Sequence, residues 1–518
     1  KLHSMKPSIV IAFSLLGYVS AFIPHLKPRR VRQWVSASHP TDQEMPVNNG
    51  TSAPPQRNDL RIVMKFGGSS LADADRIRYV AQLIADQRLN TAKSIMVVCS
   101  AMGKSTNSLI NAGEYALSDG RLYMDSIRSS HLATCDSLDV SNNTRDEIKA
   151  LLNELEKLLM GVSVLRELTP RTRDLLVSFG ERMSVRLVAS CLNSMGVPSE
   201  YFESWTLGMR TTSDFGNALV DESSYGPLRD KLSSFDPLMV PVITGFIGQD
   251  EAGSITTLGR GGSDLTAAVL GAACGLDEIQ VWKDVDGMLT ADPRIVPKAR
   301  PVPSVTFEEA SELAYFGAKI LHPISMLPAM KSNIPVRVKN SYNPSHPGTL
   351  ISAERCYLDA KHAADHDDGT LVTAITSKSN QMVLDVVSNR MLGQYGFLAS
   401  VFKKFEEAKI SVDMIATSEV SVSLTVDPSE SDLSDNKFLN ELREVAAVSV
   451  DHGNSILSLI ANVQKSSNVL AAVFAILEQE GIQVKMISQG ASKVNISVIV
   501  RDADLEKAIA ALHRYFFE

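Results

Sequence analysis

The stretch RIVMKFGGSS, residues 61–70, indicates the fold class of this chain. An apolar run rich in β-branched residues that ends in two glycines is typical of a strand buried on both faces of a parallel sheet. After it, Ile77, Val80, Ala81 and Ile84 recur at helical spacing, which predicts an amphipathic helix. A strand, a glycine turn and a helix in this order form the repeating unit of α/β folds.

The same pattern recurs three times before residue 352. The recurrences are SIMVVCSAMG (94–103), PLMVPVITGFIG (237–248) and EIQVWKDVDG (278–287). We therefore expect residues 60–352 to form one α/β unit with a mostly parallel sheet. Residues 353–370 show no hydrophobic periodicity and predict a connector.

The C-terminal part contains an internal repeat. LASVFKKFEEAKISVDMI (398–415) returns 72 residues later as LAAVFAILEQEGIQVKMI (470–487). Each copy has the order strand, helix, strand, strand, which suits a ferredoxin-like module. We expect one module over residues 371–450 and a second over 451–518, with the strand at 371–377 assignable to either.

Composition is that of a soluble globular protein of about three to four domains, since the 518 residues are 44% hydrophobic and 21% charged. The five cysteines stand singly, so we expect reduced thiols and no metal cage. The formal charge is −8, and residues 1–60 carry seven Lys and Arg against three Asp and Glu, so the remainder is more acidic still. An acidic body argues against a nucleic-acid partner.

The N-terminal segment predicts a targeting presequence. Residues 1–21 resemble a signal peptide, with an apolar run too short to span a membrane and Val19-Ser20-Ala21 before a cut at Phe22. Residues 22–59 are basic at first and then polar, which is typical of a transit peptide and a linker. This pair resembles the bipartite presequence of proteins sent to complex plastids, and secretion or a membrane anchor are the alternatives. We expect a plastid protein with no membrane partner in its mature form.

The first glycine turn carries candidate phosphate chemistry. Gly67 and Gly68 let backbone N–H groups approach an anion, and Ser69 adds a hydroxyl. Lys65 stands just before the turn and is placed to reach the same anion.

A second glycine turn, TLGRGGSDLTA (257–267), repeats this logic. Arg260 offers a guanidinium fork for a carboxylate, and Asp264 lies in the first turn of a helix predicted to end near Gly275. Two such turns, each after a strand and beside a cation, favour a ligand site over simple tight turns.

Three motifs resemble known binding loops but lack residues that those loops require. GKST (103–106) lacks the first P-loop glycine, GRGG (259–262) lacks the third glycine of a dinucleotide fingerprint, and KDVDGMLTADPR (283–294) lacks two ligands of a calcium loop. The sequence contains neither a nucleophile elbow nor a zinc-protease motif.

Six ordered motifs carry a family resemblance that covers residues 60–518. The motifs are KFGGSS (65–70), SAMGKSTN (100–107), SFGERMS (178–184), TLGRGGSDLTA (257–267), WKDVDGMLTADPR (282–294) and FGAKILHP (316–323). Together they resemble the aspartate kinase branch of the amino-acid kinase family, in its monofunctional plant-type form, and the repeats resemble ACT domains. The resemblance implies a three-layer α/β/α kinase fold followed by two ferredoxin-like ACT domains.

The implied reaction is the phosphorylation of the L-aspartate β-carboxylate by ATP with Mg²⁺, the first step of lysine, threonine and methionine biosynthesis. A carboxylate is already ionised at neutral pH, so positioning and charge neutralisation suffice. The catalytic set implied by the family motifs is Lys65, Gly67, Gly68, Ser69, Asp264 and Lys319. The implied aspartate-binding set is Ser100, Thr106, Glu181, Arg260 and Ser263. The implied ATP-binding set is Lys65, Lys283, Asp284, Leu289, Arg294 and Lys319.

Taken singly, several of these residues have simpler interpretations. Glu181 alone reads as a solvated or salt-bridged helix residue, and Lys319 alone as a surface lysine. Asp284 alone suits the cap of a turn, and His322 before a proline suits a structural role.

Other functions compete with this interpretation. Related amino-acid kinases share the glycine-turn logic but lack SFGERMS together with paired ACT repeats. A catalytically inactive amino-acid sensor would not need Lys65, Arg260, Asp264 and Lys319. A dehydrogenase would need a dinucleotide fingerprint.

The first repeat is the candidate site for inhibition by lysine, with S-adenosylmethionine as a further candidate effector. Its glycine turn precedes a helix N-terminus that suits a carboxylate, and acidic and hydroxyl side chains follow for the ammonium groups. The candidate set is Met391, Gly396, Phe397, Leu398, Val412, Asp413, Ser418 and Glu419. Lys485 stands in the second repeat where the first has Asp413, which predicts a structural or pairing role for the second module. We expect a homodimer or a higher homo-oligomer through these domains.

Overall fold

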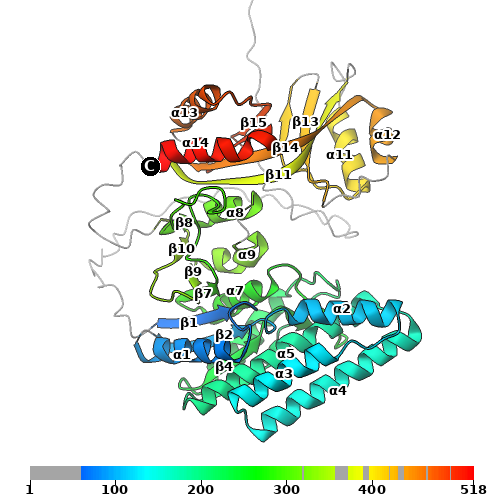
Figure 1. Cartoon of the computed structure of the whole chain (residues 1–518), viewed down its shortest axis with the longest axis vertical. Coiled ribbons are helices and arrows are strands. Elements are labelled where there is room, and N and C mark those ends of the chain that lie inside the picture. The colour runs from blue at the N-terminus through cyan, green and yellow to red at the C-terminus, as the bar shows by residue number, and fades with distance from the viewer. Residues whose placement is uncertain are drawn as a thin grey trace, which may run out of the picture.

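The computed structural model describes residues 60–90, 92–317, 320–355, 371–388, 396–418, 421–429, 437–461, 465–490 and 492–518. Figure 1 shows two parts, a helix-rich unit and a smaller sheet whose helices lie on one side. After the resemblance of their motifs, we label the first part the kinase unit and the second the regulatory sheet. The two parts correspond to the α/β unit and the paired repeats that the sequence predicts.

An eight-stranded sheet forms the centre of the kinase unit, in the order β3-β4-β2-β1-β7-β9-β10-β8. All neighbours in it are parallel except β9 and β10. The strands are β1 (Leu60–Phe66), β2 (Ala92–Cys99), β3 (Ser199–Phe202), β4 (Val240–Thr244), β7 (Glu278–Lys283), β8 (Ser304–Thr306), β9 (Val336–Asn340) and β10 (Thr349–Ser352). A small hairpin, β5 (Ile247–Gln249) with β6 (Ile255–Thr257), lies apart from it.

Alternating side chains of β1 enter two different hydrophobic cores because successive residues of a strand point to opposite faces. Ile62, Met64 and Phe66 belong to the core formed with one set of helices, and Val63 belongs to the core formed with the other. The first set is α1 (Ala74–Asn90), α2 (Ser105–Ser118), α3 (Asp125–Leu138), α4 (Asn142–Leu165) and α5 (Pro170–Ser194). The second set is α6 (Tyr225–Ser233), α7 (Gly262–Cys274), α8 (Phe307–Tyr315) and α9 (Pro323–Lys331). The three-layer α/β/α fold is therefore confirmed.

The regulatory part is one six-stranded antiparallel sheet in the order β12-β13-β11-β14-β16-β15. The strands are β11 (Val372–Val387), β12 (Ile415–Thr417), β13 (Ser421–Val426), β14 (Ala447–Ala461), β15 (Met486–Gln489) and β16 (Asn495–Arg501). The helices are α11 (Phe397–Glu407), α12 (Lys437–Arg443), α13 (Ser466–Gln479) and α14 (Leu505–Phe517).

Both repeats share the two long central strands. The first half of β11 pairs with the second half of β14, as at Ile375 and Leu459, and the second half of β11 pairs with the first half of β14, as at Val386 and Val448. Residues 372–378 thus lie beside strands of the second repeat, although they precede the first repeat in the chain. The two modules are joined through hydrogen bonds of a common sheet.

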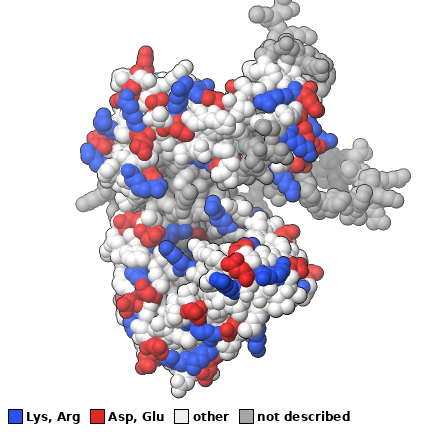
Figure 2. Space-filling model, turned by 45° about the vertical axis from the view of Figure 1, so that its right-hand side comes forward, with Lys and Arg blue, Asp and Glu red and all other residues white. Residues whose placement is uncertain are grey.

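The face in Figure 2 mixes Lys and Arg with Asp and Glu over both parts. Within the described ranges, no helix is both long enough and apolar enough to cross a bilayer. The four cysteines among the described residues are free thiols.

Candidate active site

A buried ion cluster joins three elements of the kinase unit. Lys65 near the end of β1 lies with its Nζ 2.6 Å from Oδ1 of Asp264, in the first turn of α7. Lys283, the last residue of β7, lies with its Nζ 3.3 Å from the other oxygen of that carboxylate. Because β1 and β7 are parallel neighbours, their carboxyl ends bring both lysines to the same edge of the sheet.

Charge pairing controls the titration of this cluster. Burial alone would raise the pKa of Asp264, but the ammonium groups of Lys65 and Lys283 outweigh burial and leave the pKa below its usual value. Burial, aided by the nearby charge of Lys65, lowers the pKa of Lys283. The cluster holds two cations against one anion, which leaves a formal positive charge for an anionic ligand.

The first glycine turn lies directly after Lys65 and contacts the turn that follows β2. A Cβ atom on Gly68 would lie 2.6 Å from the carbonyl oxygen of Gly103 and 3.0 Å from that of Ala101. The Gly103 N–H donates to the Gly68 carbonyl at 3.1 Å. Only glycine fits this approach, so the packing of the two backbone turns requires glycine at position 68. Ser69 is exposed beside it.

Glu181 is buried, so the simpler interpretation of this residue taken alone, a solvated or salt-bridged helix residue, is wrong. It lies in α5 at 2% exposure, and its Oε1 accepts a hydrogen bond from the Ala101 N–H at 3.0 Å. Its Oε2 is buried without a hydrogen-bond partner. Burial raises the pKa of this carboxyl to about 8, against opposing contributions from the Ala101 amide and Lys65.

The second glycine turn presents Arg260 to solvent. On one side of the arginine, Gly261 has φ +77°, and a Cβ there would lie 2.7 Å from the Cβ of His322. On the other, a Cβ on Gly259 would lie 2.5 Å from Oδ1 of Asn217. His322 itself precedes α9 as its N-cap, and its carbonyl accepts from Ser325, which agrees with a structural role.

Two serines connect the two turns. The Ser100 hydroxyl, after β2, donates to the Ser263 hydroxyl at 2.8 Å, and Ser263 directly precedes Asp264. Thr106 is half-buried in the first turn of α2. The predicted substrate-binding residues Ser100 and Ser263 are therefore neighbours in space.

Asp174 is a buried carboxylate that sequence reasoning missed. It accepts hydrogen bonds from the N–H groups of Gly216 and Thr257 and from the Thr257 hydroxyl, at 2.8 to 2.9 Å. Asp174 lies two helical turns before Glu181 in α5. Its hydrogen bonds hold Gly216 and Thr257, which lie in the two chain segments beside the Arg260 turn. A spacing of seven residues before Glu181 was the available signal, since residues seven apart share a helix face.

The predicted nucleotide residues after β7 are more dispersed. Asp284 is exposed, Leu289 is half-buried, and Arg294 is exposed and paired with Asp292 at 2.6 Å. The chain around Arg294 packs on the regulatory part, because Ala291 and Val296 belong to the core of the second repeat. The structure therefore brings Lys283, but not Arg294, into the cluster around Asp264. Lys319 lies outside the described residues.

In the first repeat, the Asp413 carboxylate is already paired. Its Oδ2 lies 2.8 Å from the Nζ of Lys378 on β11, and its Oδ1 accepts from the Tyr315 hydroxyl at 2.9 Å. Lys378 also pairs with Asp427 at 3.1 Å. Burial would lower the pKa of Lys378, but the two carboxylates raise it above its usual value.

The other predicted lysine-site residues surround the start of α11 and β12. Gly396 caps α11 with φ +87°, Leu398 is exposed, and Phe397 and Val412 are half-buried. Ser418 hydrogen-bonds Ser421. Met391 and Glu419 lie outside the described residues.

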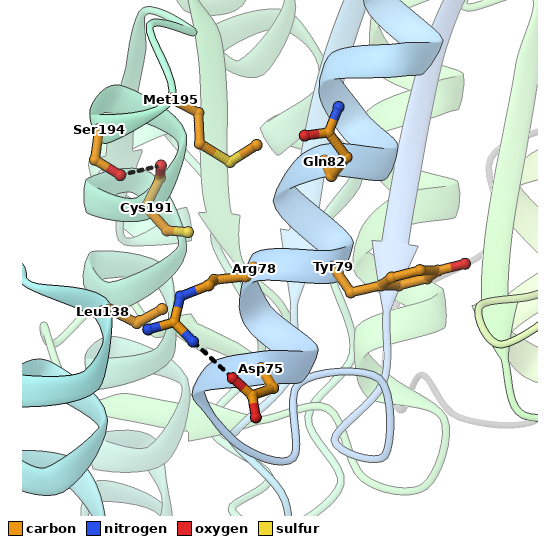
Figure 3. A pocket seen from close by; sticks show the side chains of 8 residues that line it. All are labelled: Asp75, Arg78, Tyr79, Gln82, Leu138, Cys191, Ser194 and Met195. Atoms are coloured by element: carbon orange, nitrogen blue, oxygen red, sulfur yellow. Dashed lines mark hydrogen bonds and ion pairs between the residues drawn. The ribbon is translucent and has the colours of Figure 1, made fainter.

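A hollow on the outer surface of α1 and α5 is lined by neither the lysines nor the glycine turns of the candidate site. Figure 3 shows its lining, in which Arg78 pairs with Asp75 and the Ser194 hydroxyl donates to the Cys191 carbonyl. Its lining shares no residue with the cluster around Asp264.

A mostly parallel sheet whose glycine turns adjoin the lysines around Asp264 is typical of a phosphate-handling enzyme, and here it is joined to an antiparallel sheet built from two repeats. The amino acid kinase family matches residues 60–340, and the ACT domain matches residues 384–434 and 458–516. The Arabidopsis thaliana protein "Aspartokinase 1, chloroplastic" is 48% identical over 475 residues, which are 89% of this chain and 80% of the relative. The Escherichia coli "Lysine-sensitive aspartokinase 3" is 36% identical over 88% of this chain and 99% of its own length.

A solved structure gives the same result. Escherichia coli aspartokinase III in complex with aspartate and ADP matches with a TM-score of 0.73 and 35% identity, over 88% of this chain and all of that one. This chain belongs to the aspartokinase family. It is an aspartate kinase, a transferase that uses ATP, and it carries ACT domains.

Proposed function

We propose that Lys65 and Lys283 neutralise the transferred phosphoryl group while ATP phosphorylates the aspartate β-carboxylate. The observation that carries this assignment is the cluster in which both lysines share the Asp264 carboxylate beside the Gly67–Gly68 turn. Asp264 holds the two ammonium groups toward the turn, and the backbone amides add donors for phosphate oxygens. The aspartate carboxylate attacks the γ-phosphorus, the bond to the ADP oxygen breaks, and no general base is required.

Arg260 and Glu181 are the proposed clamps for the rest of the substrate. The Arg260 guanidinium is exposed and suits the α-carboxylate as a bidentate partner. The unpartnered Oε2 of Glu181 suits the α-ammonium, because a buried carboxylate oxygen without a donor gains most from a cationic ligand. Asp264 is occupied by two lysines, so we assign the ammonium to Glu181 rather than to both carboxylates. Lys319 is kept as a second phosphoryl cation.

Mg²⁺ fits this site as a companion of the nucleotide. The buried carboxylate of Asp264 is engaged by two lysines, and the described residues contain no group of three metal-binding side chains. The ion, held by ATP phosphates, would supply further charge neutralisation.

Inhibition by lysine through the first repeat is proposed on two grounds, a solved relative that contains lysine and the charge around Asp413. Escherichia coli aspartokinase III has been solved with lysine and aspartate, at 35% identity to this chain. The Asp413 and Asp427 pair supplies excess negative charge for an ammonium group. A bound lysine would share or displace the contacts that Lys378 and Tyr315 make with Asp413.

Three further features are proposed. S-adenosylmethionine is a second candidate effector, assembly is through the ACT domains, and the N-terminal segment directs the enzyme to a plastid. The chloroplastic names of the Arabidopsis relatives support the destination. Fluorescence of a fusion with residues 1–58 confined to the medium or cytosol would contradict the plastid.

The decisive test is a hydroxamate assay with aspartate and ATP, with and without lysine. We expect acyl phosphate formation that depends on both substrates and falls when lysine is added. Product formation from glutamate instead of aspartate would contradict aspartate as the substrate. Insensitivity to lysine would contradict only the proposed inhibition by lysine.

A further inference from the structure

The segment NSYN, residues 340–343, begins with the last residue of β9 and contacts both turns that carry the lysines of the active site. In the central sheet β9 is the neighbour of β7, and β7 is the neighbour of β1. The segment reaches past the end of β7, because Tyr342 contacts the glycine turn that follows β1. It therefore joins two turns that are distant in the sequence.

Two side chains of this segment hold the first glycine turn. The Tyr342 hydroxyl donates to the Ser69 carbonyl at 3.0 Å. The Ser341 hydroxyl lies 2.9 Å from the Ser70 hydroxyl, and both of these serines are fully buried. The segment is thus fixed against the backbone of the turn at one residue and against a buried side chain at the next.

The hydrogen bond from Tyr342 fixes the last of three successive carbonyl groups in this turn. The carbonyls of Gly67 and Gly68 accept hydrogen bonds from backbone N–H groups, and the carbonyl of Ser69 accepts from Tyr342. Because the C=O and N–H of a trans peptide unit point in opposite directions, fixing these carbonyls also fixes the direction of the amides that follow them. Backbone amides of this turn are the donors proposed for phosphate oxygens.

Arg76, in the first turn of α1, braces the tyrosine from one side. Its guanidinium carbon lies 3.7 Å from the centroid of the Tyr342 ring, which is a favourable cation–π contact. One guanidinium nitrogen also donates to the carbonyl of Ser341 at 3.2 Å and to its hydroxyl at 3.1 Å. Arg76 therefore restrains both residues of the segment that contact the first glycine turn.

The same segment holds the turn that follows β7. The Ser341 N–H donates to the Lys283 carbonyl at 2.7 Å. The side-chain amides of Asn340 and Asn343 donate to Oδ1 of Asp286 at 2.9 and 3.1 Å. One short segment thus sets the backbone at Lys283 relative to the first glycine turn.

We propose that Arg76 and Tyr342 are positioning residues for phosphoryl transfer. They fix the orientation of the first glycine turn and its separation from Lys283, and they act through the backbone of Ser69 and Ser341. This inference rests on the proposed function for the roles of the turn amides and of Lys283.

The test compares Tyr342→Phe with Tyr79→Phe in the full chain. Both tyrosines are exposed, at 52% and 39%, so neither loss of a hydroxyl threatens folding. The Tyr79 ring also faces Arg76, but at 4.9 Å, and it lines the outer hollow of Figure 3. Tyr342→Phe should lower kcat about fivefold while the KM for aspartate stays within about twofold, because small displacements of a positioned group reduce turnover. Tyr79→Phe should keep the parental kcat.

Arg76→Lys tests the brace. It keeps the charge but loses the planar fork that stacks on Tyr342 and bonds to Ser341, so kcat should fall about fivefold or more. Adding Tyr342→Phe to this variant should cost less than Tyr342→Phe alone, because the ring is already unbraced. A lower melting temperature with parental kcat, measured where the variant is folded, would show a structural role only and overturn the proposal.

Lys65→Ala separates this inference from the proposed function. Near-parental kcat in Lys65→Ala would contradict the proposed function itself. A large loss in Lys65→Ala, with parental kcat in Tyr342→Phe or in Arg76→Lys, would overturn the positioning role alone. An equal loss in Tyr79→Phe and Tyr342→Phe would also overturn it.

Discussion

The kinase unit and the regulatory sheet each contain a three-membered ion cluster, and the two clusters have opposite composition. In the kinase unit Lys65 and Lys283 share the single carboxylate of Asp264, which leaves one formal positive charge. Such a surplus in a buried site is costly until an anion neutralises it. The cluster therefore suits a phosphoryl group.

The regulatory cluster has the reverse count. Asp413 and Asp427 share the ammonium of Lys378, which leaves one formal negative charge and suits a cationic ligand. In the second repeat Lys485 pairs with Asp451, one charge against one, and also donates to Asn454 at 2.7 Å. The comparison supports the first module, rather than the second, as the proposed site for the ammonium of an amino acid.

Removing a cation from the kinase cluster should have the largest effect. Lys65→Ala leaves Asp264 with one partner and removes a donor to the transferred group, so kcat should fall about 10²- to 10³-fold. Steady-state assays at saturating aspartate and ATP measure this. Lys149→Ala, an exposed lysine on α4, is the control and should retain parental kcat. Near-parental turnover in the Lys65 variant would break the assignment of the positive cluster to catalysis.

Removing the negative surplus from the regulatory cluster should have the next largest effect. Asp413→Asn keeps the shape of the side chain but leaves Lys378 and Asp427 balanced, so the lysine concentration for half-inhibition should rise about tenfold. Each variant is compared with its own activity without lysine. Unaltered sensitivity to lysine would show that this surplus does not recognise the effector.

Glu181 sharpens the comparison through pH. Because burial raises its pKa to about 8, the carboxyl is mostly protonated at pH 7 and must lose a proton to hold the substrate ammonium. The KM for aspartate should therefore fall by roughly five- to tenfold between pH 7 and pH 8.5. Glu181→Gln should weaken aspartate binding and flatten this pH profile. A profile that keeps its slope in Glu181→Gln would assign the titration to another group.

The smallest effect is expected in the second repeat. Lys485→Ala removes one half of a balanced surface pair, and such pairs contribute little to stability. Sensitivity to lysine and the melting temperature should both stay close to parental values, with the inhibition constant within about twofold. A loss of lysine inhibition here, with Asp413→Asn unaffected, would reverse the assignment of the two modules.

Local patterns along the sequence determine much of this protein. The apolar run before Gly67, the helical spacing of Ile77, Val80 and Ile84, and the 72-residue repeat each predict an element that the structure contains. These features depend on the period of side chains along one strand or helix and on the freedom of glycine, which neighbouring residues encode.

The partners of charged and aromatic side chains are decided only by the tertiary structure. The family motifs imply Asp264 as a catalytic residue and Glu181 as an aspartate-binding residue, but they do not give the surroundings of either side chain. Packing places the first between two lysines and buries the second. The shared strands β11 and β14 and the contact of Tyr342 with Ser69 have the same origin. Contacts between residues far apart in the chain depend on which surfaces the layers bring together, and neither spacing nor composition records that choice.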